Sequence, residues 1–190
     1  MSTSPHRIIA LTAPSGAGKT TIARRLLAER NDLRFSVSAT TRPPREGEVD
    51  GVHYHFVSPE RFSAMISEGE LLEYEEVYPG RYYGTLVSEV ERATQTGSVL
   101  LDVDVKGALH VKELFGERAL TLFVAPPSLD ELRDRLTARG TETAETLAVR
   151  MTRAQEELTY AKRFDAVVVN DDLETAVSET YRRVTAFLST

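Results

Sequence analysis

Short apolar runs recur along the chain, and segments with helical spacing separate them. Four of these runs are long enough to form one buried strand each, at residues 7–11, 98–102, 120–124 and 166–169. Apolar runs of this length without alternation are typical of strands that are buried on both faces. Because such runs alternate with helical segments, the pattern predicts an α/β protein with a parallel sheet covered on both faces.

The helical segments are marked by periodicity and by capping residues. Residues 19–30 place apolar side chains at helical spacing, at Ile22, Leu26 and Leu27. Ser128 and Glu131 match a capping box, which predicts a helix that runs to about Arg139. Residues 143–161 carry one apolar stripe, which consists of Leu147, Met151, Ala154 and Leu158.

Residues 35–83 interrupt this rhythm. The segment is rich in proline and glycine, and the alternation of residues 52–56 predicts a short antiparallel strand. Ser58 precedes Pro59, which predicts a helix with Ser58 as its cap and a proline in its first turn. We interpret this segment as a lobe inserted into the parallel-sheet core.

Composition argues against several classes of function. The chain has no cysteine, which excludes a disulfide framework and a cysteine zinc site. Its net charge of −6 argues against general binding to DNA. His53 and His55 alternate on the predicted strand, but two histidines without cysteine make a weak metal site. No apolar run approaches the ~20 residues that span a bilayer, so we expect a cytoplasmic protein with no nucleic-acid or membrane partner.

The stretch "APSGAGKT" at residues 13–20 follows the first strand and precedes the first helix. In a phosphate-binding loop, backbone N–H groups surround a phosphate at a helix N-terminus. Gly16 and Gly18 can adopt positive φ, Lys19 supplies an ammonium group, and Thr20 supplies a hydroxyl for Mg²⁺. Ala13 replaces the usual first glycine but removes no donor. An ordinary turn of small residues is the alternative, and it gives no reason for Gly-Lys-Thr in this context.

A second basic cluster lies on a proline-stiffened loop of the inserted lobe. Arg42 and Arg45 flank Pro43 and Pro44, and paired guanidinium groups suit the oxygens of a phosphate monoester. Taken alone, this cluster is weak evidence, because arginines near surface prolines are mostly solvated.

Further motifs follow in order, and their sequences are "SATTRPPREGEVDGVHYHF", "GRYYGT", "LLDVDVKG", "APPS" and "RGTET". Together with the loop, they resemble guanylate kinase, the nucleoside monophosphate kinase that makes GDP from GMP and ATP. The likeness runs from Arg7 to about Phe187, and an alanine at the position of Ala13 also occurs in that family. The resemblance implies GMP, and also dGMP, as substrates, with ATP and Mg²⁺ and a monomer or small homo-oligomer.

The resemblance also implies an architecture. A P-loop core of three layers would comprise residues 1–34, 86–126 and 164–190. The inserted lobe of mixed β and α structure, residues 35–85, would bind GMP. Residues 127–163 would form the helical lid and its flanking helices.

The resemblance assigns the site residue by residue. The ATP side would be residues 13–21, namely Ala13, Pro14, Ser15, Gly16, Ala17, Gly18, Lys19, Thr20 and Thr21, together with Asn170. The GMP phosphate would contact Arg42, Arg45, Tyr54 and Tyr83. The base would contact Ser38, Glu73 and Thr85. One carboxylate can accept both the N1–H and the 2-amino group of guanine, whereas adenine has an acceptor at N1, so Glu73 would select guanine. Without the resemblance, a solvated acid in an acidic run would be the favoured interpretation of Glu73.

Two carboxylates and two arginines complete the predicted catalytic group. Asp102 and Asp104 follow a buried strand, and Mg²⁺ would be held by Thr20 and, through water, by Asp102. Which of the two carboxylates serves metal water and which serves GMP stays open, and Asp104 is also a helix-cap candidate. Arg139 and Arg150 would stabilise the transferred phosphate from the lid, with Arg135 and Arg153 as competitors. The catalytic residues would be Lys19, Arg42, Asp102, Arg139 and Arg150.

Two other functions are compatible with the fold. Guanylate-kinase-like scaffold modules keep the architecture but bind partner proteins, and they typically lack a working ATP loop. A kinase for AMP or another monophosphate is the second alternative. Fold alone does not decide between an enzyme and a scaffold, so the site residues have to. Lys19, Thr20 and Asp102 are all present, which favours an enzyme, because scaffold modules typically lack a working ATP loop.

Overall fold

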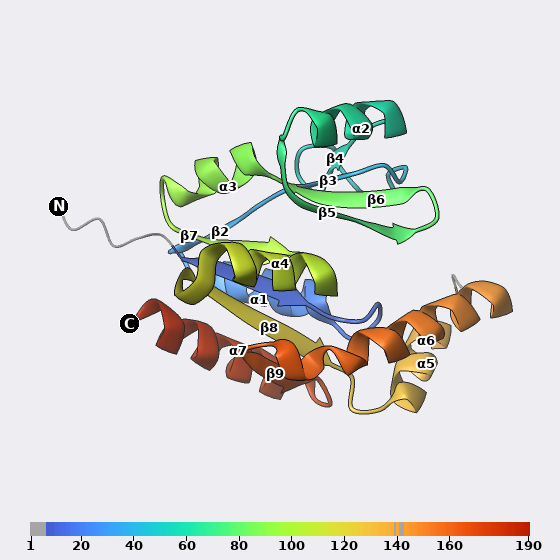
Figure 1. Cartoon of the computed structure of the whole chain (residues 1–190). Coiled ribbons are helices and arrows are strands. Elements are labelled where there is room, and N and C mark those ends of the chain that lie inside the picture. The colour runs from blue at the N-terminus through green and yellow to red at the C-terminus, as the bar shows by residue number, and fades with distance from the viewer. Residues whose placement is uncertain (1–6, 139, 141–142) are drawn as a thin grey trace.

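The computed structural model describes residues 7–138, 140 and 143–190 of the 190-residue chain. A five-stranded parallel sheet forms its centre, with the order β2-β7-β1-β8-β9 (Figure 1). The strands are β1 Ile8–Thr12, β2 Leu33–Phe35, β7 Ser98–Asp102, β8 Ala119–Ala125 and β9 Ala166–Val169. The four predicted strands are confirmed within one residue at each end, and β2 is the strand that the apolar pattern missed.

Helices cover both faces of this sheet, which confirms the three-layer α/β fold. Alternate residues of β1 face opposite layers, because successive side chains of a strand point to opposite sides. Ile9 and Leu11 pack with α1 (Lys19–Glu29) and α7 (Leu173–Leu188). Ile8 and Ala10 pack with α3 (Val87–Thr94) and α4 (Val105–Phe115). Within the described ranges, no helix has both the length and the apolar character to cross a membrane.

A second, four-stranded sheet lies above the first and has the order β4-β3-β6-β5 (Figure 1). Its elements are β3 Ser38–Thr40, β4 His55–Phe56, α2 Pro59–Ser67, β5 Leu71–Tyr78 and β6 Arg81–Leu86. Strands β5 and β6 form an antiparallel hairpin, and Gly80 occupies its turn with φ of 73°. The predicted cap is confirmed, because the Ser58 hydroxyl accepts a hydrogen bond from the Arg61 N–H at 3.2 Å.

Two packed helices, α5 Leu129–Ala138 and α6 Ala144–Thr159, lie beyond the carboxyl end of β8 (Figure 1). Their buried residues Leu132, Leu136 and Ala154 form one cluster with Ala17 of the glycine-rich loop. The predicted cap at Ser128 is present, since its hydroxyl accepts a hydrogen bond from Glu131 at 3.0 Å. Short 3-10 turns at Gly116–Arg118 and Ala161–Arg163 lead into β8 and β9.

The predicted antiparallel strand at residues 52–56 is wrong. Residues 51–53 form a turn, and the two-residue strand β4 pairs with β3 in parallel. Gly51 has a φ of 72°, and the Asp50 carboxylate accepts a hydrogen bond from the Phe56 N–H at 2.8 Å. Local turn chemistry therefore outweighs the alternation of apolar and polar residues. Phe35, at the predicted start of the lobe, belongs instead to β2 of the central sheet.

Candidate active site

A cleft of about 820 Å³ lies between the central sheet, the second sheet and α6. Most of the predicted site residues line it, although they come from distant parts of the chain. They are Ala13, Pro14, Ser15, Gly16, Gly18, Lys19, Thr20, Thr21, Ser38, Arg42, Arg45, Tyr54, Glu73, Tyr83, Asp102, Asp104 and Arg150. Ala17, Thr85 and Asn170 do not line the cleft but lie directly behind residues that do. Arg139 lies outside the described residues.

The glycine-rich loop is held in one conformation from behind. Gly16 and Gly18 have φ of 97° and 99°, which is the left-handed region that favours glycine. The buried Asn170 side chain donates a hydrogen bond to the Ala17 carbonyl at 2.7 Å. A Cβ atom at Gly18 would lie 2.2 Å from Asn170 Nδ2. Asn170 was predicted on the adenine side, and in this structure it supports the loop.

Lys19 begins α1 and points toward the end of β7. Its ammonium forms an ion pair with the Asp102 carboxylate and donates a hydrogen bond to the Val103 carbonyl at 3.1 Å. Gly18, the N-cap residue of α1, has no side chain with which to cap the helix. The first N–H groups of α1 and the Lys19 ammonium therefore form a positive site at one wall of the cleft.

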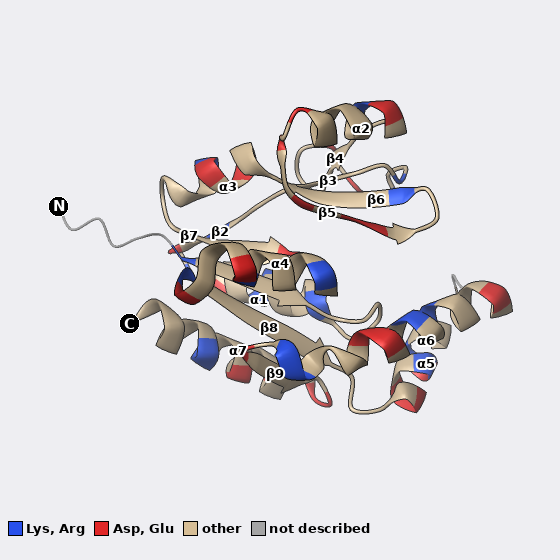
Figure 2. Cartoon of the chain, viewed as in Figure 1, with Lys and Arg blue, Asp and Glu red and all other residues tan. Residues whose placement is uncertain are grey.

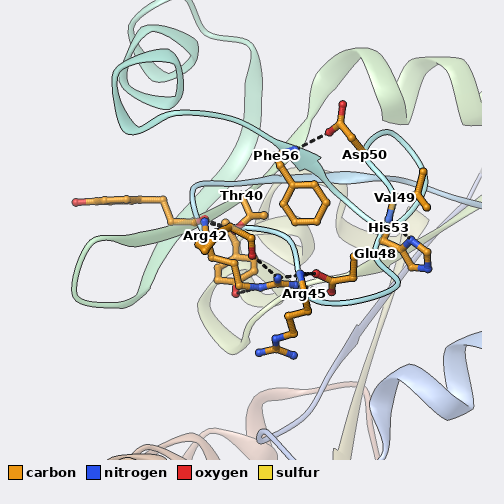
Figure 3. Close-up of polar contacts among 11 residues, drawn as sticks. Thr40, Arg42, Arg45, Glu48, Val49, Asp50, His53 and Phe56 are labelled. Atoms are coloured by element: carbon orange, nitrogen blue, oxygen red, sulfur yellow. Dashed lines mark hydrogen bonds and ion pairs between the residues drawn. The ribbon is translucent and has the colours of Figure 1, made fainter.

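Arg42 is buried in the opposite wall and is held by Glu48, a residue that sequence reasoning missed. Its two terminal nitrogens each lie 2.7 Å from a different Glu48 oxygen (Figure 3). Its Nε donates to the Tyr83 hydroxyl at 3.2 Å. The guanidinium also lies 5.1 Å from the centre of the Tyr54 ring. Arg42 is 6% exposed, so this arrangement fixes its orientation toward the cleft.

Glu48 also organises the loop that carries Arg45. Its carboxylate accepts a hydrogen bond from the Arg45 N–H at 2.7 Å, while the Arg45 guanidinium extends away from Glu48 (Figure 3). The bidentate hydrogen bonds from Arg42 lower the pKa of Glu48 to about 2. A signal for this role existed in the sequence, since an acid three residues after Arg45 on a proline-stiffened loop can fold back onto both arginines.

Glu73 lies at the inner end of the cleft and is 7% exposed. Burial is the main cause that raises its pKa to about 7. The nearby Asp104 carboxylate acts in the same direction, whereas the Thr85 hydroxyl, which donates to Oε1 at 2.5 Å, lowers the pKa. Gly107 makes room for this carboxylate, because a Cβ atom there would lie 2.3 Å from Glu73 Oε2. Thr85 pairs with Ser38 across β3 and β6, so the three residues predicted for the base are neighbours.

Asp104 lies beside this group and caps α4, as one of the two alternatives predicted. Its side chain accepts a hydrogen bond from the Gly107 N–H at 2.7 Å. Burial raises the pKa of Asp104 above its ordinary value. The cap role and a place in the cleft are therefore held by one carboxylate.

Helix α6 contributes two arginines to the cleft, and they lie one turn apart. Arg150 donates a hydrogen bond to the Ser15 hydroxyl of the loop at 2.6 Å. Arg153 donates to the Val77 carbonyl of β5 and, through Nε, to Glu157 at 2.7 Å. Arg135 does not line the cleft and instead bonds Glu131 and the Asn170 carbonyl. Arg153 is thus the neighbour of Arg150 that reaches the site.

Oxygen ligands for a hard cation lie beside the loop. Thr20 is exposed in the first turn of α1, and Asp102 ends the adjacent strand. Among the described residues there is no group of three or more histidine, aspartate or glutamate side chains that could form a metal cage. Mg²⁺ commonly uses one or two protein oxygens together with water and phosphate oxygens, so this donor set fits it.

The two histidines of residues 52–56 have separate partners. His53, in a turn, accepts a hydrogen bond from the Val49 N–H, and His55 lies 3.7 Å from Glu89.

Basic and acidic residues alternate within single helices. Figure 2 shows basic and acidic segments next to one another on α3 and α6. The positive groups of the cleft are therefore a local arrangement in an acidic protein, with a net charge of −6.

Comparison with known proteins gives consistent similarities. The family model described as guanylate kinase matches residues 5–187. A guanylate kinase of Salinibacter ruber is 62% identical over 184 residues, which are 97% of this chain and 98% of that protein. One of Bacteroides fragilis is 49% identical over 98% of this chain and 94% of its own length. The crystal structure of guanylate kinase from Anaplasma phagocytophilum is 33% identical and superposes with a TM-score of 0.79, covering 95% of this chain and 85% of that one.

Proposed function

The chain belongs to the guanylate kinase family, and from that premise we propose how its own residues transfer a phosphoryl group from ATP to GMP. The chain is an enzyme, because relatives of up to 62% identity are guanylate kinases and align with it over almost their full length. Neither a scaffold module nor a kinase for another monophosphate is favoured by these relatives. The roles of individual residues are the substance of the proposal.

On the donor side, residues 13–21 bind the ATP phosphates. The positive φ of Gly16 and Gly18 supports this role, because it turns successive N–H groups of the loop toward one point. The Lys19 ammonium exchanges its Asp102 partner for phosphate oxygens when ATP binds. Asn170 contributes indirectly by fixing the Ala17 carbonyl.

On the acceptor side, Arg42, Arg45, Tyr54 and Tyr83 bind the phosphate of GMP. An arginine has five N–H donors, and Arg42 directs four of them at Glu48, Tyr83 and the Pro43 carbonyl. Arg42 thus presents a fixed positive charge and few free donors, whereas Arg45 supplies an exposed guanidinium. We assign the anchoring of the phosphate to both arginines and its orientation mainly to Arg42.

Glu73 selects the base. Its carboxylate is buried beside Thr85 and Ser38, where no water shell competes with a nucleobase. Guanine offers two adjacent N–H donors to one carboxylate, and adenine leaves the same carboxylate opposite an acceptor. A site of this kind discriminates between such bases by about 10⁴ or more, since the wrong base leaves a buried polar group unpaired.

The chemistry requires positioning and charge stabilisation more than proton transfer. The phosphate of GMP is already an anionic nucleophile, so no residue has to act as a general base. Arg150 places positive charge near the transferred group, and the resemblance predicts the same role for Arg139, which lies outside the described residues. Mg²⁺, held by Thr20 and through water by Asp102, would supply neutralisation of the phosphate charge when bound.

One observation supports this proposal most strongly. The glycine-rich loop and the Arg42 group, which consists of Arg42, Arg45, Tyr54 and Tyr83, line one cleft from opposite walls. The test is the turnover of GMP, dGMP, AMP, IMP and UMP with ATP and Mg²⁺, measured by ADP formation. We expect GMP and dGMP to be used and AMP to be poor, and a folded Lys19→Ala variant to lose activity. Equal rates for Lys19→Ala and the wild type, or a preference for AMP, would refute the proposal.

A further inference from the structure

Three structural units meet at one side chain, Arg153. It comes from α6, its Nη1 donates to the Val77 carbonyl of the β5–β6 hairpin, and its Nη2 lies 3.6 Å from Asp104 at the end of the central sheet. Its Nε also bonds Glu157 one turn further along α6, at 2.7 Å. The α6 helix, the acceptor lobe and the core therefore share one guanidinium.

Tyr78 strengthens the same junction from the side of the hairpin. Its ring centre lies 5.4 Å from the guanidinium of Arg153 and 5.8 Å from that of Arg150. Such distances are typical of attraction between a cation and an aromatic face. Because residues three apart on a helix share one face, Arg150 and Arg153 reach Tyr78 together.

Electrostatics explains why this junction needs a cation. Asp104 and Glu157 are both largely buried, and each has its pKa raised by burial, while their like charges repel one another. Arg153 lies beside both carboxylates and offsets this repulsion. Without it, two carboxylates from different units would face each other across the junction with less positive charge between them.

The consequence concerns Arg150, which contacts Ser15 of the loop at 2.6 Å. The hairpin that touches Arg153 also carries Glu73, at the other end of β5. The contact between Arg153 and the Val77 carbonyl is a route by which a shift of the hairpin on GMP binding would reach α6 and Arg150. We infer that Arg153, with Tyr78, is a positioning residue that couples occupancy of the acceptor lobe to the placement of Arg150. The inference rests on the proposed function.

The test measures coupling between the two substrates. The Kd of GMP is determined by calorimetry without and with a saturating nonhydrolysable ATP analogue and Mg²⁺. We expect GMP to bind the wild type about tenfold more tightly when the analogue is present, within the range usual for coupled sites. Arg153→Ala should reduce this factor to about threefold or less. The measured quantity is the ratio of the two GMP affinities, so a variant that weakens GMP binding equally with and without the analogue keeps the wild-type factor and would overturn the inference. Arg182→Ala, on the exposed face of α7, is the matched control and should keep the wild-type factor.

Two further variants keep the test informative if Arg153→Ala does not fold. Tyr78→Leu should lower the coupling factor, and Tyr78→Phe, which retains the ring, should restore it. Wild-type coupling in Arg153→Ala or in Tyr78→Leu, or a wild-type factor of one, would overturn the inference. A wild type that makes no GDP would refute the proposed function. A wild type that makes GDP, together with unchanged coupling in Arg153→Ala, would refute this inference alone.

Discussion

The protonation of Glu73 should set the pH dependence of GMP binding. Burial raises the pKa of this carboxyl to about 7, so the group changes charge within the ordinary assay range. The ionised form can accept both N–H groups of guanine, whereas the protonated form presents an O–H to them. Affinity for GMP should therefore fall as the pH drops through about 7.

The size of this effect follows from the ionised fraction. A group with a pKa of about 7 is about 90% ionised at pH ~8 and about 10% ionised at pH ~6, and apparent affinity scales with the competent fraction. The KM for GMP should thus rise about tenfold over this interval. The GMP phosphate also titrates, with a pKa near ~6, so its contribution has to be separated.

Glu73→Gln provides that separation. The variant should have a higher KM for GMP at every pH and should show the contribution of the phosphate alone. The KM for GMP is measured by steady-state ADP formation at saturating ATP from pH ~6 to ~8. The KM for ATP, measured at saturating GMP, is the internal control. A flat KM for GMP in the wild type, or the same pH profile in Glu73→Gln, would refute the assignment of Glu73.

Three further outcomes are expected. Glu48→Gln should raise the KM for GMP about tenfold and leave the Kd of ATP unchanged, because the buried Arg42 guanidinium loses charge-assisted hydrogen bonds of about 1.5–3 kcal/mol. Glu179→Gln on α7 is the control and should change neither constant. A change in ATP binding instead of GMP binding in Glu48→Gln would contradict the role of Glu48. Gly18→Ala should abolish ATP binding and lower the free energy of unfolding by about 1–3 kcal/mol in urea titrations, whereas Gly47→Ala, with open space around it, should keep ATP affinity; equal effects at both glycines would be inconsistent with the close packing behind the loop. In Glu73→Gln, the unfolding free energy should exceed that of the wild type by about 3 kcal/mol at pH ~8 and by little at pH ~4. The reason is that the pKa of the Glu73 carboxyl is 4.5 in the unfolded chain and about 7 in the folded protein, so the wild type loses stability as the pH rises between these values. A difference that does not grow with pH would contradict the burial of this charge.

Features that depend on local sequence were predicted well. The strands at 98–102 and 166–169 and the cap at Ser58 depend on residues within a few positions of one another. The short strand at 52–56 failed because Gly51 and Asp50 form a turn that alternation alone cannot reveal.

Contacts that depend on distant partners were not predicted. Asn170 supports a carbonyl 153 positions away, and Arg153 reaches a carbonyl 76 positions away. Neither partner can be read from local spacing, since each exists only after the strands have assembled. Family resemblance carried most of the substrate assignments, and Glu48 lay outside them because its contacts are to other protein side chains.

The most direct test of the account uses one molecule that fills both pockets. An adenosine and a guanosine joined by five phosphates should span the cleft between the loop and the Arg42 group. Its Kd, measured by calorimetry, should be at least about 100-fold lower than that of ATP or GMP alone, because linking makes the second contact intramolecular. A linked compound that binds no more tightly than GMP would show that the two pockets do not face each other, and would contradict the account.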